Sequence, residues 1–453
     1  MIDLTPLKGK TYAVIGLGRS GLATLAAMKA CAIAYKAWDD NAKAREKAEE
    51  MGFRMTAPAQ GLVDGVDAFV MSPGIPHTLP APHPEAALAK SKNIPLTTDI
   101  ALFRQACPDM PLVGITGTNG KSTTTALVGH LLAKVQKTQV GGNIGTAVMS
   151  LDSNADSTVL ELSSYQLEIT DNLNCDIAIW LNVTPDHIDR HGDLIGYIKA
   201  KARIFEGNKM GSVAILACDD PHMRGVAKEL EAQGKWNVVP VITTEKWSKG
   251  ITVEDGILYE DGERVCDLQQ TTALKGAHNH QNAACAYAAL RYGFPKMEKE
   301  TLVSGLMDFP GLEHRQKPVR TIDNVVFIND SKATNADATS KALNSFENIY
   351  LIAGGVAKEG GLEGLQKYKD RVVKTYLIGQ AKDDFAAWLD KNGMDYVISD
   401  TLDKAVIAAA KDARHAANKD NAVVLLSPAC ASFDQYGSYE ERGAHFIRLV
   451  GEI

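Results

Sequence analysis

The sequence lacks the features of a secreted or membrane-spanning protein. Its seven cysteines are odd in number and none belongs to a Cys-x-x-Cys pair, which argues against a disulfide framework and a zinc knuckle. No apolar run approaches the ~20 residues that a transmembrane helix needs. Residues 1–10 include Asp3 and Pro6 and contain no apolar segment of the kind found in signal peptides. These absences predict reduced thiols, no membrane insertion and a cytoplasmic location.

The sequence also lacks a basic tract. Lys and Arg number 48 against 55 Asp and Glu, a formal net charge of −7, which disfavours a nucleic-acid partner. Hydrophobic residues make up 45% of the chain and charged residues 23%, which is typical of a globular protein. A chain of 453 residues is too long for one hydrophobic core and predicts about three domains.

The most informative stretch is a glycine-rich run that ends in Lys-Ser. It reads Gly114-Ile-Thr-Gly-Thr-Asn-Gly-Lys-Ser122, between a predicted buried strand (111–115) and a predicted helix (123–134). Glycines let backbone N–H groups converge on an anion at a helix N-terminus, Lys121 adds charge for the phosphates, and Ser122 has a hydroxyl suited to Mg²⁺. Ile115 occupies the first glycine position of the usual G-x4-G-K-[ST] pattern. The run still indicates a nucleoside triphosphate site in preference to a plain strand–helix turn.

A second glycine motif lies near the N-terminus. A predicted strand (11–15) leads into Gly16-Leu-Gly-Arg-Ser-Gly21, a helix, and a second strand that ends at Asp39-Asp40. This pattern is typical of a Rossmann-like dinucleotide site, but the same turn accommodates any diphosphate. A third strand (68–71) runs into the sharp turn Ser72-Pro73-Gly74. We place the first domain boundary near residue 98.

Further buried strands alternate with helices along the rest of the chain. We expect them at 158–162, 177–183 and 213–217, and in the last third at 325–328, 349–353, 375–378 and 423–426. Shorter, polar-interrupted runs at 236–275 predict a small antiparallel element, and an Ala-rich helix follows at 276–292. Apolar strands alternating with helices predict parallel sheets covered on both faces. The expected fold class is therefore α/β.

Polar side chains gather where several of these strands end, and open α/β sheets bind ligands at such ends. Glu161 is either a metal ligand beside Ser122 or a carboxylate paired at the sheet terminus. We interpret His187, which follows a buried strand, as a metal ligand, and His191 as a surface histidine. The clusters 329–335 and 427–432 are rich in Ser and Thr or Asn, and each fits either a helix N-cap or a cradle for a carboxylate.

Taken together, these motifs resemble those of the Mur ligases, the ATP-dependent amino-acid ligases of peptidoglycan precursor synthesis. The likeness covers nearly the whole chain: the turn at Gly16, SPGI at Ser72, GITGTNGKST at Gly114, GGNIG at Gly141, ELSSYQLE at Glu161, LNVTPDHIDR at Leu181, HNHQN at His278, GLEHR at Gly311, INDSKATN at Ile328 and SPACASFDQY at Ser427. ELSSYQLE and SPACASFDQY are the most specific. Within the family the motifs match the branch that adds D-glutamate.

The resemblance implies three domains. Residues 1–98 would form a Rossmann-like domain that binds the UDP-sugar, and residues 99–312 a central P-loop domain with a parallel sheet that binds ATP. Residues 313–453 would form a C-terminal Rossmann-like α/β domain that binds the amino acid.

The resemblance also implies which residues bind ATP and magnesium. The phosphates would contact Gly117, Thr118, Asn119, Gly120, Lys121, Ser122 and Thr123, and the nucleotide would contact Asn279, Asn282, Arg315 and Asp330. Two Mg²⁺ ions are expected, with Ser122, Glu161, His187 and Lys201 as ligands. Lys201 matches a carbamylated lysine of the family, although its spacing alone indicates a helix-surface lysine. The catalytic residues implied are Lys121, His187, Lys201 and Lys332.

Substrate contacts follow from the same resemblance. The UDP-sugar site would comprise Ser20, Asp39, Asp40, Ser72, Gly74 and Asn143. The D-glutamate site would comprise Thr334, Lys358, Ser432, Phe433 and Tyr439.

The implied activity is ATP-dependent addition of D-glutamate to UDP-N-acetylmuramoyl-L-alanine through an acyl phosphate, with ADP and phosphate as products, by a monomer. A first alternative is another amide ligase on this scaffold, either a different Mur ligase or a folylpolyglutamate synthase. A second is an NAD(P)-dependent oxidoreductase that uses residues 16–40, for which the phosphate loop would have no purpose. A third is a non-catalytic nucleotide-binding regulator, to which Glu161, His187 and Lys332 would be superfluous.

Overall fold

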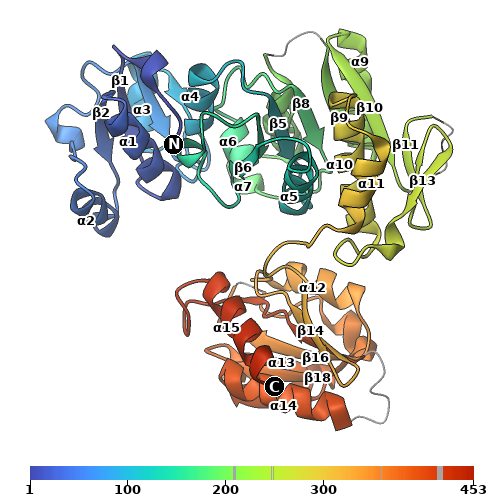
Figure 1. Ribbon diagram of the computed structural model, residues 1–453. Helices are drawn as coiled ribbons and strands as arrows, with labels where there is room; N and C mark the ends of the chain where they lie inside the picture. Colours follow the sequence, from blue (N-terminus) through green and yellow to red (C-terminus); the bar gives the residue numbers. More distant parts are fainter. Residues whose placement is uncertain (208–210, 246, 248, 359, 416–421) are drawn as a thin grey trace. The chain divides into compact units, whose positions relative to one another are not determined.

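The structure is a computed structural model that describes residues 1–207, 211–245, 247, 249–358, 360–415 and 422–453. The chain packs as two compact units, Met1–Phe309 and Pro310–Ile453 (Figure 1). The first unit contains a four-stranded and a nine-stranded sheet, and the second contains a six-stranded sheet. Helices connect the strands in each unit, so the α/β fold class is confirmed. The division of the first unit at residue 98 stays a prediction.

The N-terminal sheet is entirely parallel, with strand order β2-β1-β3-β4. Its strands are β1 (Thr11–Ile15), β2 (Ala34–Trp38), β3 (Ala68–Met71) and β4 (Leu96–Thr97). The helices are α1 (Arg19–Ala30), α2 (Ala42–Glu50), α3 (Pro84–Ser91) and α4 (Asp99–Ala106). Because β1 lies between β2 and β3, the turns that follow these three strands meet at one edge of the sheet.

The central sheet has the order β13-β12-β11-β10-β9-β8-β5-β7-β6. Its strands are β5 (Leu112–Thr116), β6 (Thr138–Gly142), β7 (Ser157–Glu161), β8 (Ile177–Trp180), β9 (Ser212–Ala217), β10 (Trp236–Ile242), β11 (Ile251–Glu254), β12 (Ile257–Glu260) and β13 (Glu263–Asp267). The helices are α5 (Lys121–Leu132), α6 (Ser164–Leu167), α7 (Ile188–His191), α8 (Leu194–Ala202), α9 (Pro221–Gln233), α10 (Ala277–Gly293) and α11 (Lys299–Met307).

One detail of this sheet differs from the expectation. Residues 236–242 were predicted to belong to an antiparallel element, but β10 pairs in parallel with both β9 and β11. Among the described strands of this sheet, the antiparallel pairs are β11 with β12 and β12 with β13. The sequence Trp-Asn-Val-Val-Pro-Val-Ile mixes polar and apolar residues, so its pattern did not reveal that it continues the parallel sheet.

Alternation along β5 places side chains in two cores. Val113 and Ile115 point to the face covered by α5 and α10, and Leu112 points to the opposite face. That opposite core also includes Val14 and Val70 of the N-terminal sheet, so the two sheets share one continuous apolar core. Strands buried on both faces are typical of parallel sheets. This packing leaves the loop after β5 at a rigid, buried strand end.

The second unit has strand order β14-β15-β20-β16-β18-β19, in which only β14 is antiparallel to its neighbour. The strands are β14 (Lys317–Ile322), β15 (Val325–Asn329), β16 (Ile349–Gly354), β18 (Val372–Ile378), β19 (Tyr396–Asp400) and β20 (Val423–Leu426), with a separate pair β17 (Val356–Ala357) and β21 (Cys430–Ala431). The helices are α12 (Ala336–Ser345), α13 (Lys382–Asn392), α14 (Leu402–His415) and α15 (Tyr439–Glu452). Two apolar cores cover the two faces of the sheet.

Candidate active site

The loop between β5 and α5 is shaped by two backbone positions that favour glycine. Gly117 has a φ of 153° and Gly120, which precedes α5, has a φ of 84°. A Cβ on Gly120 would lie 2.3 Å from Oδ1 of Asn282 in α10, and Asn282 in turn donates to Asn279 Oδ1 at 3.2 Å. Both asparagines predicted to contact the nucleotide therefore lie beside this loop. The loop ends at the first turn of α5, where a helix leaves N–H groups without acceptors inside the helix and favours an anion.

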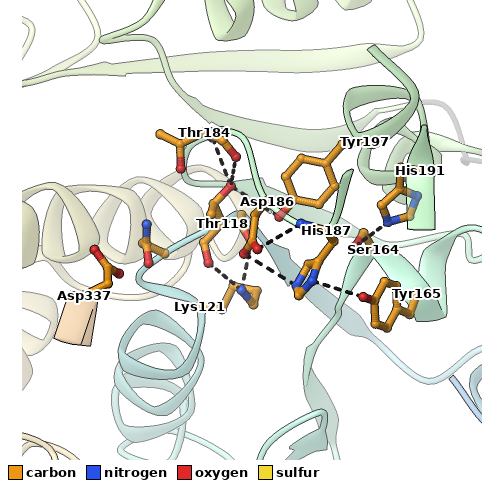
Figure 2. Close-up of polar contacts among 12 residues, drawn as sticks. Thr118, Lys121, Ser164, Tyr165, Thr184, Asp186, His187, His191, Tyr197 and Asp337 are labelled. Carbon is orange, nitrogen blue, oxygen red and sulfur yellow. Dashed lines mark hydrogen bonds and ion pairs between the residues drawn. The ribbon is translucent and has the colours of Figure 1, made fainter. Parts of the chain in front are cut away.

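A side chain that the sequence analysis did not single out holds this loop in place. Asn182, which follows β8, accepts at Oδ1 from the N–H groups of Thr118 (3.1 Å) and Asn119 (2.8 Å). The Thr118 hydroxyl donates to the carbonyl of Thr184 at 3.2 Å, as Figure 2 shows. Asn182 lies inside the LNVTPDHIDR motif, and a polar residue at the end of a buried strand is the signal that would have found it.

Two lysines converge on one carbonyl of the loop. Lys121 Nζ donates to Gly117 O at 2.9 Å, and Lys201 Nζ donates to the same oxygen at 2.8 Å. Lys201 is only 1% exposed, so the interpretation of a helix-surface lysine from spacing was wrong. Burial, and then the charge of Lys121, lowers the pKa of Lys201 to about 6. The environment of Lys201 therefore disfavours its ammonium form relative to the uncharged amine, which is a nucleophile.

The carboxylate of Glu161 fits a cation. Glu161 ends β7 and is 3% exposed, and its Oε1 accepts from Asn143 Nδ2 at 2.9 Å. Its Oε2 is buried and has no hydrogen-bond partner among the described residues. A buried carboxylate oxygen without a donor is costly unless a positive group neutralises it, and Mg²⁺ prefers oxygen ligands. Ser122 and Thr123 are buried in the first turn of α5.

His187 caps the N-terminus of α7 in the left-handed region, with a φ of 53°. Its Nδ1 lies 3.1 Å from the hydroxyl of Tyr165, and its Nε2 lies 3.5 Å from Asp186 Oδ2 (Figure 2). The imidazole is 45% exposed, so it is accessible to a ligand. Within the part of the chain that the structure describes, no group of three or more His, Cys, Asp or Glu residues forms a metal cluster. The predicted ligand set of Ser122, Glu161, His187 and Lys201 stays a prediction.

The side chain of His191 is almost fully buried, which corrects its interpretation as a surface histidine. Its side chain is only 3% exposed, with Nδ1 at 3.5 Å from Glu168 Oε2 and Nε2 at 3.0 Å from Ser164 Oγ. Burial lowers the pKa of His191, and the charge of Glu168 offsets this only in part. The rings of His187 and His191 both lie against Tyr165 and Tyr197.

The turns of the N-terminal sheet bring several predicted UDP-sugar residues together. A Cβ on Gly21 would lie 1.9 Å from Gly16 O, so this turn requires glycine. Ser72 Oγ donates to Gly16 O at 2.9 Å, and Asp39 Oδ2 accepts from the N–H of Leu17 at 2.6 Å. The ends of β1, β2 and β3 are thereby tied to one another. Of the other predicted residues, Ser20 lies in the first turn of α1, Gly74 in the turn after β3, and Asp40 beside His83 at 3.1 Å.

Arg19 connects this turn to the central sheet and was not identified from sequence. Its guanidinium donates to the carbonyls of Gly145 (2.7 Å) and Asn143 (3.3 Å). The Asn143 side chain in turn donates to Glu161. The central arginine of G-L-G-R-S-G is the signal that was available, since it is the only charged residue of that motif.

In the second unit, a buried carboxyl group joins two of the predicted clusters. Asp330 is 4% exposed, and it accepts from Ser427 Oγ at 2.7 Å and from the N–H of Gln316 at 3.1 Å. Burial raises the pKa of Asp330 to about 7, while Ser427 and the charge of Arg315 act in the opposite direction. The clusters that follow β15 and β20 therefore form one polar site.

The predicted amino-acid residues have different environments in this unit. Lys332 Nζ lies 5.4 Å from the centre of the Tyr439 ring. Ser432 is 2% exposed, whereas Phe433 is 75% exposed. Thr334 is half-buried, and Lys358 is exposed just after β17.

Arg442 is a functional candidate that sequence reasoning missed. It is 1% exposed and donates to Ser331 Oγ (3.0 Å), Ser331 O (2.8 Å) and Cys430 O (3.1 Å). Burial lowers its pKa to about 10. The side chain thus binds the loop after β15 to the loop after β20. Its position one turn along α15 from Tyr439 gave no local signal of this role.

Known proteins resemble this chain in sequence. Residues 115–290 match the Mur ligase middle domain. Over 99% of its length the chain is 44% identical to a UDP-N-acetylmuramoylalanine–D-glutamate ligase of Paramagnetospirillum magneticum, of which it covers 98%. The chain belongs to the Mur ligase family.

Solved Mur ligases share the fold at low sequence identity. The UDP-N-acetylmuramate-alanine ligase MurC of Thermotoga maritima superposes with a TM-score of 0.59 at 17% identity, covering 98% of this chain and 99% of that one. MurF ligase of the same organism, solved in complex with ADP, gives a TM-score of 0.54 at 17% identity, covering 87% and 90%. Mur ligases use ATP, which accounts for the glycine-rich loop at residues 114–122. The alternative of an NAD(P)-dependent oxidoreductase leaves this loop without a function and is not favoured. Among the described helices, none is both long and apolar enough to cross a membrane.

Proposed function

We propose that the protein joins D-glutamate to UDP-N-acetylmuramoyl-L-alanine with ATP, through an acyl phosphate, and releases ADP and phosphate. The observation that supports this most directly is the group formed by Lys121, Lys201 and Glu161 around the β5–α5 loop. The backbone N–H groups and Lys121 of the loop can bind the triphosphate, and the unpartnered carboxylate oxygen of Glu161 can bind its metal ion. The full-length likeness to D-glutamate ligases supports D-glutamate as the amino-acid substrate.

The first half-reaction brings two anions together. A carboxylate oxygen of the sugar substrate attacks the γ-phosphorus of ATP, the bond to the β,γ-bridging oxygen breaks, and ADP leaves. Lys121 offsets the repulsion between carboxylate and phosphate and stabilises charge on the transferring group. Residues 117–123 bind the phosphates through backbone N–H groups, and Asn279 and Asn282 hold the nucleotide beside them.

In the second half-reaction the amine of D-glutamate attacks the acyl carbon and phosphate leaves, after the ammonium has lost a proton. In this proposal D-glutamate is bound by Thr334, Lys358, Ser432, Phe433 and Tyr439. Lys332 acts near the reacting groups. The nucleotide is contacted by Arg315 and Asp330. The UDP-sugar is bound by Ser20, Asp39, Asp40, Ser72, Gly74 and Asn143. A monomer with domains at 1–98, 99–312 and 313–453, located in the cytoplasm, completes the proposal.

Two Mg²⁺ ions would be held by Ser122, Glu161, His187 and Lys201, and when bound they neutralise phosphate charge. Lys201 suits this role only as a carbamate, because an ammonium repels a cation. In this proposal its uncharged amine attacks the carbon of carbon dioxide and loses one proton to solvent, and the product is a carbamate anion with two oxygens. The low pKa of Lys201 favours that reaction at neutral pH.

A phosphate-release assay tests the proposal. With ATP, Mg²⁺ and UDP-N-acetylmuramoyl-L-alanine, we expect phosphate release that depends on D-glutamate, with little response to L-glutamate or other amino acids. Release that depends equally on another amino acid, or on a different UDP-sugar, would contradict the assignment while keeping the reaction type. No ATP-dependent release with any of them would contradict the reaction itself.

A further inference from the structure

A buried ion pair lies where three segments of the first unit meet. Glu168 follows α6 directly, Arg190 lies in α7, and their side chains are only 9% and 5% exposed. Arg190 Nε donates to Glu168 Oε1 at 2.8 Å, and Nη2 donates to the same oxygen. Glu161 starts the segment that leads to Glu168, and His187 starts the one that leads to Arg190. The pair therefore connects the loops that present two candidate metal ligands.

The same pair also holds the turn after β3. Arg190 Nη2 donates to the carbonyl of Ile75 at 3.1 Å and lies 3.3 Å from Nδ1 of His77. His77 Nδ1 is also 3.3 Å from Glu168 Oε1. Ile75 and His77 continue the turn that contains Ser72 and Gly74. The UDP-sugar turn of the N-terminal sheet is thus fixed to the central sheet by a charged group that sits between them.

On its other side the pair reaches His187 through aromatic and hydroxyl groups. The Arg190 guanidinium carbon lies 5.1 Å from the centre of the Tyr165 ring, and the Tyr165 hydroxyl lies 3.1 Å from His187 Nδ1. Glu168 Oε2 lies 3.5 Å from His191 Nδ1, and His191 Nε2 bonds to Ser164 (Figure 2 shows His187, Tyr165, His191 and Ser164). Tyr165 thus contacts Nδ1 of His187, while Nε2 of the same ring lies 3.5 Å from Asp186 Oδ2.

Stability alone does not account for a pair of this kind. Apolar residues of similar volume often serve equally well in place of a buried ion pair, whereas losing one partner leaves a buried charge. Among the residues that the structure describes, the side chains of Glu168 and Arg190 contact each other, the turn after β3 and residues around His187, and they do not contact residues 117–123. These contacts therefore fix the turn after β3 relative to the segment that begins at His187.

We propose that Glu168 and Arg190 are positioning residues that hold the sugar-binding turn in register with His187, so that the substrate carboxylate arrives at the phosphate site. This inference depends on the proposed function, because it assigns the turn at Ser72 to the sugar nucleotide. It predicts that disturbing the pair weakens binding of the sugar nucleotide selectively and leaves binding of ATP intact.

Arg190→Lys is the first test, because it keeps the charge but loses the two-pronged contact and the reach to Ile75. Titration calorimetry on the full chain, without metal or ATP, measures the Kd of UDP-N-acetylmuramoyl-L-alanine, and a second titration measures ATP. We expect the sugar Kd to rise about tenfold and the ATP Kd to change less than twofold. Arg291→Lys is the matched control. Arg291 Nε lies 2.8 Å from Glu260 Oε1, and this ion pair is not part of the loops that Glu168 and Arg190 join. It should change neither constant.

His77→Ala provides a second variant in case Arg190→Lys does not fold. His77 is partly exposed and touches the pair only at its edge, so we expect a two- to fivefold rise in the sugar Kd with an unchanged melting temperature. Equal weakening of sugar and ATP, or a lower melting temperature with unchanged constants, would overturn the positioning role. Absence of sugar binding by the wild-type chain would instead contradict the proposed function.

Discussion

At the scale of single residues, burial determines which lysine of α8 disfavours its charged ammonium form. Lys199 is exposed and Lys201 is 1% exposed, although they are two positions apart on one helix. The nearby charge of Lys121 adds to the burial in disfavouring an ammonium at Lys201. A sequence pattern contains no information on this difference, because both residues belong to the run Lys-Ala-Lys-Ala-Arg.

This contrast gives a direct test of carbamylation. Lys201→Ala should lose most of the ligase activity, on the order of a hundredfold or more, because it removes the anion that would hold a metal. Short carboxylates such as acetate should restore part of that activity by occupying the space of the carbamate. Lys199→Ala is the control and should retain activity. Full activity of Lys201→Ala, or an inactive variant with no carboxylate rescue, would count against the carbamate.

Asp330 gives a prediction about pH and stability. Its pKa is raised to about 7 in the folded protein, so the folded state binds more protons than the unfolded state between about pH 4 and 7. Stability from this group is therefore present at low pH and is lost as pH rises through that window, at about 1.4 kcal/mol per pKa unit. Asp330→Asn has one acceptor oxygen for the N–H of Gln316 and an NH2 group that can donate to the Ser427 hydroxyl. It should therefore stabilise the second unit at pH 8 by a few kcal/mol, but not at pH 4.

Denaturant unfolding at the two pH values measures the effect. Asp337→Asn serves as control, because that carboxylate is 76% exposed and pairs with Lys341 at the surface. It should change stability by less than about 0.5 kcal/mol at either pH. A stabilisation from Asp330→Asn that is the same at pH 4 and pH 8 would show that proton binding is not its cause.

At the scale of helices and strands, the phosphate loop depends on close packing of α10 against the start of α5. Gly120 has a positive φ, and a side chain there would meet Asn282 at 2.3 Å. Gly120→Ala should therefore cost about 1–3 kcal/mol and weaken ATP binding at least tenfold, because both the backbone and Asn282 must move. Gly225→Ala in α9 is the matched control, since a Cβ there meets no atom within 4 Å. It should be neutral or slightly stabilising, and ATP binding by isothermal titration distinguishes the two variants.

The elements show what the sequence could and could not predict. Strands such as β5, β7 and β16 were located because apolar residues buried on both faces leave an unbroken run. The turns after them were located because glycine and polar residues are needed where a strand ends. β10 was misassigned because its polar residues resemble an alternating strand, and parallel or antiparallel pairing depends on distant neighbours. Asn182, Arg19 and Arg442 were missed for the same reason, since their partners are far away in sequence.

At the scale of the whole molecule, Met1–Phe309 and Pro310–Ile453 each have their own cores. Two such units with separate cores should unfold in two transitions and not as one cooperative system. In differential scanning calorimetry, the isolated segment 310–453 should reproduce one of the two transitions and so identify it. A single transition in the full chain, at a temperature that the segment does not share, would show instead that the units unfold together.

Ligands should then shift the two transitions separately. UDP-N-acetylmuramoyl-L-alanine is proposed to bind at Asp39 and Ser72, so it should raise the melting temperature of the first unit alone. At one hundred times its Kd a ligand stabilises by about 2.7 kcal/mol, which corresponds to roughly 5 °C for a unit of this size. D-Glutamate should raise only the transition of the second unit, where Ser432 and Tyr439 lie, and Ser432→Ala should abolish that rise. A sugar nucleotide that shifts the second transition, or D-glutamate that shifts the first, would reverse the assignment of substrates to units.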